Sequence, residues 1–172
     1  MKRSSRMKMV LAALFAALVF VGTFYLHVTL PYGYFNFGDA FLLLAAWCIG
    51  GRYGAAAGAI GAVLADLALG YAAYVPATLV IKAAMALAAS GIATAWAKRT
   101  PRLKYAGFLL GAVTAELLMA AGYYLFESLL YGFVPALASV PGNLLQGTAA
   151  VIVGTLAMTA LESAGLFKKL SL

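Results

Sequence analysis

Apolar residues form long runs along this sequence, and short polar or glycine-rich segments separate them. Six of these runs predict helices, at about 9–27, 39–49, 53–70, 77–97, 105–126 and 141–165. A straight membrane-spanning helix needs about 20 mostly apolar residues, and only the segment 39–49 falls well short of that length. The first run is longer than the apolar core of a typical signal peptide, so we expect it to be retained. The pattern predicts one six-helix domain over residues 1–172.

Composition places these helices in a membrane. Hydrophobic residues make up 65% of the chain and charged residues only 10%, whereas about a quarter of a soluble domain is charged. The fold class expected is therefore an all-α integral membrane protein, with the lipid bilayer around it. The net charge of +7 does not predict nucleic-acid binding, because the basic residues lie at helix ends and not on one face. A lone Cys48 and a lone His27 predict neither disulfide nor metal site, and no cofactor is expected.

The positions of the basic residues predict the orientation. Eleven of the twelve lysines and arginines fall in four segments, 1–8, 50–53, 98–104 and 166–172. The twelfth is Lys82, inside a helix, and the segments 28–38, 71–76 and 127–140 hold none. Cytoplasmic loops carry the basic excess in membrane proteins, so both termini are expected to be cytoplasmic. Without the short segment 39–49 as a span, the cluster at 98–104 would lie outside, so six spans are predicted.

Two opposite charges lie inside apolar sequence. Asp66 and Lys82 are each eight residues from Tyr74, so a tight connection over 71–76 would place them at equal depth in adjacent antiparallel helices. A charge inside a membrane costs about 2.5 kcal/mol or more and is usually functional or paired. Either the two residues form a buried ion pair that holds the helices together, or they contact a ligand.

Polar side chains gather toward the outer ends of the predicted helices, near several aromatic rings. Hydrogen-bonding groups beside aromatic rings suit the capture of a small polar aromatic solute. Tyr34 and Tyr74 could belong to such a pocket or to the aromatic belt at the membrane surface. The candidate ligand-binding residues are Tyr34, Asn36, Asp39, Asp66, Tyr74, Thr78, Lys82, Glu116, Tyr123, Glu127, Asn143 and Gln146.

Motifs for catalysis are missing from the sequence. It contains no G-x-x-x-x-G-K-[ST] loop for a triphosphate, and a single histidine leaves no Ser-His-Asp triad, so no enzymatic activity is expected. Small residues recur four apart in the first helix, at Ala12/Ala16 and Ala13/Ala17, which favours close contact within the chain or with a partner. Gly54, Gly58 and Gly61 likewise indicate helix packing, not phosphate binding.

Three stretches together carry a family resemblance: 35–39 (FNFGD), 61–71 (GAVLADLALGY) and 76–82 (PATLVIK). With six short helices and the alanine pairs, the chain resembles the substrate-binding S components of energy-coupling factor (ECF) vitamin transporters. It is similar to the branch for pyridoxine, hydroxymethylpyrimidine or riboflavin. Ala83 stands where a glycine usually follows the lysine, which leaves the subfamily open.

The resemblance implies a prokaryotic plasma-membrane protein that binds a vitamin outside the cell beneath its first loop. It implies docking on a transmembrane coupling protein and two ATPases, which would supply the energy. The helix 1 alanines Ala12, Ala13, Ala16 and Ala17 would contact the coupling protein.

A pyridoxine-like or hydroxymethylpyrimidine-like ligand is the leading expectation, with riboflavin as the larger alternative. A phosphorylated ligand is disfavoured because every arginine is on the predicted cytoplasmic side. The rival function is an autonomous ion-coupled transporter that uses Asp66, Glu116 and Lys82 as a relay.

Overall fold

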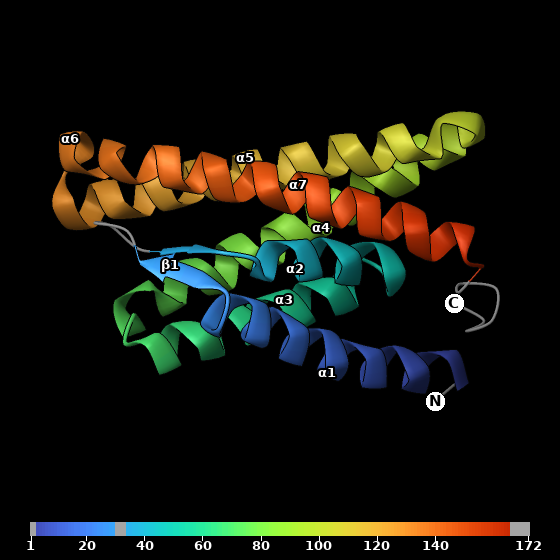
Figure 1. Ribbon diagram of the computed structural model, residues 1–172, viewed down its shortest axis with the longest axis horizontal. Coiled ribbons are helices and arrows are strands. Elements are labelled where there is room, and N and C mark those ends of the chain that lie inside the picture. The colour runs from blue at the N-terminus through green and yellow to red at the C-terminus, as the bar shows by residue number, and fades with distance from the viewer. Residues whose placement is uncertain (1–2, 30–33, 166–172) are drawn as a thin grey trace.

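The computed structural model describes residues 3–29 and 34–165, which fold into a bundle of helices (Figure 1). The helices are α1 (Arg3–Phe24), α2 (Gly38–Cys48), α3 (Gly51–Leu69), α4 (Val75–Arg99), α5 (Lys104–Tyr131), α6 (Phe133–Ala136) and α7 (Val140–Ser163). Single 3₁₀ turns over Ala72–Tyr74, Pro101–Leu103 and Leu137–Ser139 connect some of them. All six predicted helices are present, and α6 is one additional turn.

Five helical stretches of the described residues are long and apolar enough to cross a membrane: Ser5–Phe24, Gly51–Leu69, Ala72–Arg99, Pro101–Tyr131 and Phe133–Ser163. The short apolar helix Gly38–Cys48 is the sixth predicted segment. Large apolar side chains cover the outside of the bundle, such as Val80 and Leu156, which are 67% and 66% exposed. An apolar exterior of this kind suits lipid and not water, so the chain is a multi-pass membrane protein.

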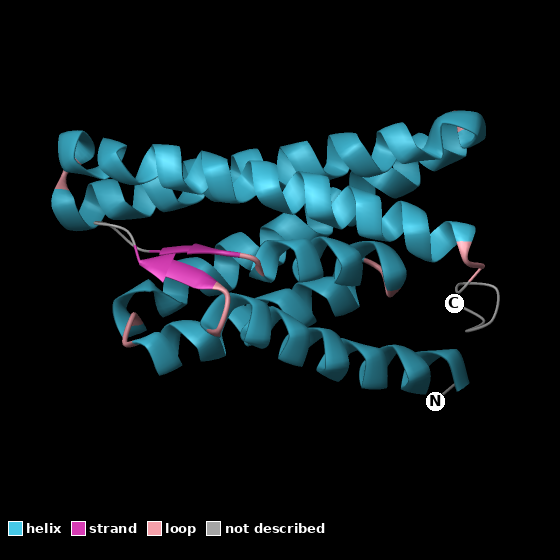
Figure 2. Cartoon of the chain, viewed as in Figure 1, coloured by secondary structure: helices cyan, strands magenta, loops and turns pink. Residues whose placement is uncertain are grey.

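The segment predicted as a plain loop before α2 contains a small β-hairpin instead. Strands β1 (His27–Thr29) and β2 (Tyr34–Asn36) pair antiparallel, with Val28 opposite Phe35. The β-branched and aromatic residues of both strands favour this extended pairing. Figure 2 shows the hairpin, in magenta, at the end of the bundle away from the start of α1 and the end of α7.

The first helix was predicted to reach His27, and that boundary is wrong. Helix α1 ends at Phe24, and the His27 ring nitrogen Nδ1 lies 2.6 Å from the Phe24 carbonyl oxygen. An imidazole contact with a free terminal carbonyl satisfies a group that every helix end leaves open. The predicted connection over 127–140 is also mostly helical, because α5 continues to Tyr131.

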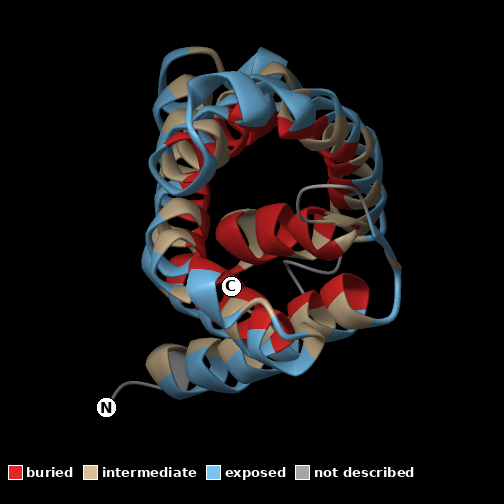
Figure 3. Ribbon diagram, turned by 90° about the vertical axis from the view of Figure 1, so that its left-hand side faces the viewer, coloured by how far each residue is buried: buried red, intermediate tan, exposed pale blue. Residues whose placement is uncertain are grey.

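Helix α2 lies inside the bundle, which explains how so short a helix belongs to the membrane domain. Eight of its 11 residues are buried, and it contacts α1, α3, α4 and α7. Leu42 and Leu43 are fully buried in the main core with Met85 and Met119. Seen end-on in Figure 3, the buried residues of the surrounding helices face inward and the exposed ones face out.

The glycines of α3 allow neighbouring helices to approach closely, as predicted. A Cβ atom at Gly54 would lie 2.6 Å from Ala46 Cα, and one at Gly61 would lie 2.4 Å from the Ala16 carbonyl oxygen. Both distances are too short for a side chain, so these contacts require glycine.

The described basic residues other than Lys82 lie away from the hairpin. Arg52 follows the start of α3, Lys98 and Arg99 end α4, and Arg102 and Lys104 join α4 to α5. We refer to this end of the bundle as the basic end and to the other as the hairpin end (Figure 1). Lys2, Lys168 and Lys169, which the orientation argument also used, lie outside the described residues.

Candidate functional site

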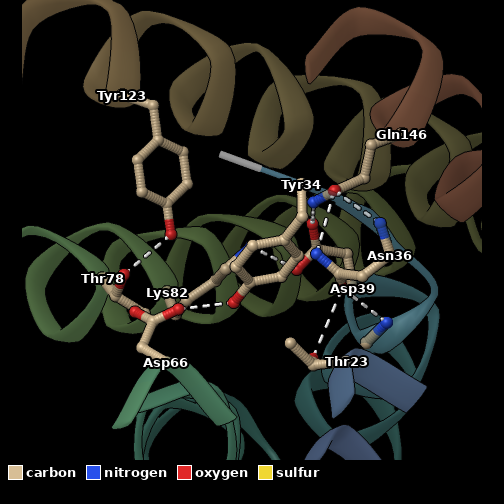
Figure 4. Close-up of polar contacts among 10 residues, drawn as sticks. Thr23, Tyr34, Asn36, Asp39, Asp66, Thr78, Lys82, Tyr123 and Gln146 are labelled. Carbon is tan, nitrogen blue, oxygen red and sulfur yellow. Dashed lines mark hydrogen bonds and ion pairs between the residues drawn. The ribbon is translucent and has the colours of Figure 1, made fainter. Parts of the chain in front are cut away.

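A buried polar cavity lies at the hairpin end, beneath β2 and among α3, α4, α5 and α7. Nine side chains line it: Tyr34, Asn36, Asp66, Tyr74, Lys82, Tyr123, Glu127, Asn143 and Gln146. All nine belong to the predicted set, although they come from segments more than 100 residues apart. Figure 4 shows most of them converging on one space.

Lys82 is paired with Asp39 and not with Asp66. The Lys82 ammonium lies 2.5 Å from Asp39 Oδ1, and both side chains are almost fully buried. Of the two alternatives for Asp66 and Lys82, the mutual ion pair is therefore not formed, and both side chains line the cavity instead. Equal depth on α3 and α4 was a reasonable basis, but α2 runs through the bundle interior and brings Asp39 closer to the ammonium.

Gln146 connects this ion pair to the hairpin. Its Nε2 donates to Asp39 Oδ2 at 2.5 Å, and its Oε1 accepts from both the backbone N–H and the Nδ2 of Asn36, each at 2.9 Å. Asn36 Oδ1 in turn accepts from the Gly38 N–H at 2.8 Å and from the Thr23 hydroxyl at 3.3 Å. One buried hydrogen-bond network thus joins α1, β2, α2, α4 and α7 (Figure 4).

Asp66 on α3 accepts a hydrogen bond from the β-hairpin. The Tyr34 hydroxyl on β2 donates to Asp66 Oδ1, while Asp66 Oδ2 is buried with no hydrogen-bond partner in the described structure. Burial, together with the Asp66 carboxylate, raises the pKa of the Tyr34 phenol well above its usual value, so the hydroxyl stays protonated and donates. The Tyr34 ring packs on Tyr71, with centroids 5.0 Å apart.

A second polar group lies on the α4–α5 side of the cavity. Glu127 accepts from the Tyr74 hydroxyl at 3.3 Å and from the Ser139 hydroxyl. The Thr78 and Tyr123 hydroxyls lie 3.0 Å apart, and the Lys82 ammonium lies 5.6 Å from the centre of the Tyr123 ring. The cavity wall therefore presents both aromatic faces and hydrogen-bonding groups.

Glu116 is the predicted residue that the structure places elsewhere. It lines a groove of about 240 Å³ between α5 and α7, which shares Asn143 with the main cavity. Both carboxyl oxygens of Glu116 and the Asn143 Nδ2 are buried without a hydrogen-bond partner in the described part of the chain. Gly147 makes room for this carboxyl, because a Cβ there would lie 2.9 Å from Glu116 Cβ.

The main cavity itself is small, about 30 Å³. A water molecule needs about 10–15 Å³ on the same measure, so the space holds water and not a vitamin ring. Most of its polar groups are bonded to one another. Entry of a ring would therefore require the wall to move, and the hairpin forms the part of the wall that is not helical.

Two members of the network were missed by the sequence reasoning. Thr23 bonds Asn36, and Ser139 bonds Glu127. Serine and threonine in helices usually satisfy their hydroxyls on their own backbone, so neither residue carries a signal of its own. Asp39 and Thr78 were predicted as ligand-binding residues; they support the cavity through Lys82 and Tyr123 and are absent from its lining.

The helix 1 alanines lie on a separate, apolar surface groove of about 750 Å³ between α1 and α3. Its lining is made almost entirely of small and aliphatic residues: Ala12, Ala13, Ala16, Ala17, Phe20, Ala56, Ala57, Ile60 and Leu64. Ala13 and Ala17 are exposed, whereas Ala12 and Ala16 pack against the core. The four predicted docking residues therefore share one open face.

Comparison with known proteins identifies the family of this chain. Residues 3–163 match the family described as ECF-type riboflavin transporter, S component. The chain is also 33% identical over 138 residues to a Pyrococcus woesei protein described as "Uncharacterized protein in gap 3'region", which covers 79% of this chain and 88% of that protein. The match extends over nearly all of the described helices and includes both the polar cavity and the α1 groove. The chain therefore belongs to the S components of ECF-type transporters, in the family described for riboflavin.

Proposed function

We propose that this chain captures an aromatic, hydroxyl-bearing vitamin with high affinity for an ECF-type importer, with riboflavin as the first candidate. The observation that carries the proposal is the buried cavity at the hairpin end, where hydrogen-bonding groups of both charges meet aromatic rings in a member of this family. Such a lining recognises a flat polar ring by stacking and by hydrogen bonds along its edge.

The unpartnered groups in and beside the cavity indicate what the ligand offers. Asp66 Oδ2 and both Glu116 oxygens are acceptors, and Asn143 Nδ2 is a donor. Because unpartnered buried polar groups are costly, a ligand with several hydroxyl or N–H donors and at least one acceptor gains most. A phosphate is a poor match, since Lys82 is the only cation in the lining and Asp39 already pairs with it.

A pyridoxine-like or hydroxymethylpyrimidine-like compound is the second candidate. The observation that favours it is the small volume of the cavity, about 30 Å³. A one-ring vitamin would need less expansion of this cavity than the three-ring riboflavin would. Either ligand requires the hairpin to move, because Tyr34 of β2 closes the cavity over Asp66.

The placement in the membrane follows from the charges. We propose six spans, with α2 as the short one, both termini in the cytoplasm of a prokaryote and the hairpin end outside. The basic end carries Arg52, Lys98, Arg99, Arg102 and Lys104, and the described residues of the hairpin end carry no lysine or arginine at the surface. This distribution supports a cytoplasmic basic end. The cavity then opens toward the external medium, where a scarce vitamin has to be captured.

Transport would depend on partners. The α1–α3 groove, with Ala13 and Ala17 exposed in it, suits the close approach of a transmembrane helix from a coupling protein. Two ATPases bound to that protein would supply the energy. Binding by this chain with energy from partner ATPases agrees with membership of the S component family. An autonomous ion-coupled transporter that uses Asp66, Glu116 and Lys82 as a relay agrees with it less well.

Calorimetry on the purified chain tests the proposal, with riboflavin, pyridoxine and hydroxymethylpyrimidine titrated separately and without nucleotide. We expect one of them to bind with a Kd in the nanomolar to low micromolar range, and the phosphorylated forms to bind more weakly. Asn143→Leu should weaken binding at least tenfold, because the Asn143 amide is free to meet a ligand. Thr159→Val is the matched control, since the Thr159 hydroxyl bonds its own helix and the residue lines neither cavity. Binding to none of the three vitamins would refute the proposal.

A further inference from the structure

A second cavity, unrelated to the vitamin site, lies near the basic end between α2, α4 and α5. Its volume is about 350 Å³. The residues that line it are Trp47, Ser90, Ala93, Thr94, Ala97, Lys98 and Phe108. Thr94 and Lys98 are exposed, so the cavity opens on the outer surface of the bundle.

The polar groups of this cavity are suited to an anionic ligand. The Trp47 Nε1–H is buried and has no hydrogen-bond partner in the described structure, and an indole nitrogen can only donate. Lys98 forms no ion pair with any described carboxylate. No acidic residue is among the lining residues. The cavity therefore offers a cation and an unused donor, with nothing to neutralise them.

These groups are arranged along the axis of α4. Ser90, Thr94 and Lys98 recur every four residues and so lie on one face of α4. Lys98 is in the last turn of α4, and Ser90 lies about 12 Å deeper at ~1.5 Å per residue. The Lys98 ammonium therefore lies at the opening of the cavity, and the Thr94 and Ser90 hydroxyls lie deeper.

The walls of the cavity are apolar. Trp47 and Phe108 pack ring to ring with centroids 5.2 Å apart, and Ala93 and Ala97 leave space beside them on α4. A flat aromatic wall next to small side chains accommodates a hydrocarbon chain. A cation at the opening, hydrogen-bond donors further in and apolar walls match the phosphate, the glycerol esters and the acyl chains of an anionic glycerophospholipid.

We propose that this cavity binds an anionic glycerophospholipid of the adjacent leaflet. Lys98 pairs with the phosphate, the Trp47 N–H donates to a glycerol-ester carbonyl, and an acyl chain lies along Phe108. Arg99 and Arg102, at the same end of the bundle, add to the attraction of an anionic headgroup. The site is independent of the vitamin, because no residue of it lines the polar cavity.

Tryptophan fluorescence provides a direct test, since the chain has only two tryptophans. In a Trp96→Phe background, Trp47 is the only reporter, and bromine atoms on lipid acyl chains quench an indole that they touch. The protein is reconstituted into bilayers in which either phosphatidylglycerol or phosphatidylcholine carries the bromines, at equal mole fraction. We expect about fivefold stronger binding of the brominated phosphatidylglycerol, the factor that one basic side chain contributes at an anionic surface.

Matched variants show which residues cause the preference for phosphatidylglycerol. Lys98→Gln should abolish it, whereas Arg102→Gln, which removes one charge at the same end but does not line the cavity, should retain most of it. Trp47→Phe keeps an aromatic side chain, with a smaller ring, and removes the N–H. Native mass spectrometry of that variant should show less retained phosphatidylglycerol than the parent protein.

Three results would overturn the proposal. Equal quenching by both brominated lipids would show that there is no anionic site at Trp47. A preference that falls equally in Lys98→Gln and Arg102→Gln would show a diffuse charge effect. Relief of quenching by soluble glycerol phosphate would show a site for free anions and not for lipid.

Discussion

The Lys82 ammonium on α4 lies 2.5 Å from the Asp39 carboxylate on α2, and both side chains are almost completely buried. Removing either partner leaves a charge in a low-dielectric interior, which costs about 3–5 kcal/mol. We therefore expect Lys82→Ala and Asp39→Ala each to lower the free energy of unfolding by about that much, and the double variant to lose less than the sum. Denaturant unfolding of the ligand-free protein in detergent measures all three.

The matched control for that cycle is the more exposed pair Lys104–Glu162, whose side chains are 42% and 18% exposed and whose charged atoms lie 2.8 Å apart. Solvent screens it, so its coupling energy should stay below about 1 kcal/mol. A cycle with Asp66 in place of Asp39 should give the smaller coupling to Lys82. If Asp66 gave the larger value, the pairing described above would be incorrect.

Tyr34→Phe tests the hairpin as the closure of the vitamin site. The change removes the hydroxyl that donates to Asp66 Oδ1, while Asp66 Oδ2 already has no hydrogen-bond partner among the described residues. The ligand-free protein should lose about 1–3 kcal/mol of stability. Ligand association should become faster, because binding no longer waits for this bond to break.

Stopped-flow quenching of riboflavin fluorescence gives the association rate for that variant. Tyr124→Phe is the control, because Tyr124 is absent from the cavity lining. An unchanged association rate with faster dissociation would make Tyr34 a direct ligand contact instead.

Gln146→Leu should release the hairpin from α7. The variant removes the acceptor for the Asn36 backbone N–H and the donor to Asp39. Losing these bonds should speed hydrogen exchange in the 34–38 segment about tenfold, as expected for roughly 1.4 kcal/mol of lost protection. Exchange followed by mass spectrometry, with Thr148→Val as the control, measures this. Exchange at the parent rate would show that the hairpin is held by other contacts.

The double variant Ala13→Leu with Ala17→Leu separates capture from transport. Both alanines are exposed in the α1–α3 groove and far from the polar cavity. Vitamin affinity of the purified variant should match the parent protein, whereas uptake by cells that contain the whole importer should fall strongly, because the leucines fill the groove. Val10→Leu with Val21→Leu, two exposed sites of α1 outside the groove lining, should leave uptake intact. Collapse of the vitamin affinity would assign the alanines to internal packing.

The orientation has its own test. Cys48 is the only cysteine, so Cys48→Ala provides a background for single-cysteine labelling. Phe133→Cys, at a position 65% exposed near the hairpin end, should react with an impermeant thiol reagent in intact cells. Pro101→Cys, at the basic end, should react only after the cells are opened. Labelling of Pro101→Cys in intact cells would contradict six spans with an internal N-terminus.

Much of the fold could be predicted because membrane helices are determined by local sequence. The apolar runs gave all six predicted helices, and Gly54 and Gly61 marked close helix contacts that the structure contains. The hairpin was not predicted. Its strands have three residues each, and their stability comes from the Asn36–Gln146 bonds, which join residues 110 apart in sequence.

The composition of the site was easier to predict than its pairings. Polar residues in apolar helices have to converge, and seven of them line one cavity together with Tyr34 and Asn36 of β2. Which partner Lys82 takes depends on how α2 crosses the interior, and no local pattern contains that information. Glu116 shows the same limit, because its helix position placed it at a plausible depth but not on the face toward the cavity.

Helix α1 contributes to both of the proposed binding surfaces. Ala13 and Ala17 line its outer groove, and two turns further on, Thr23 bonds the Asn36 side chain of the vitamin-site network. If both surfaces bind as proposed, the two binding equilibria obey thermodynamic linkage. By whatever factor a bound vitamin changes the affinity for the coupling protein, the coupling protein must change the affinity for the vitamin by the same factor. A coupling protein that binds the vitamin-bound form more tightly would thus also raise the affinity for the vitamin. A coupling protein that prefers the vitamin-free form would promote release of the vitamin.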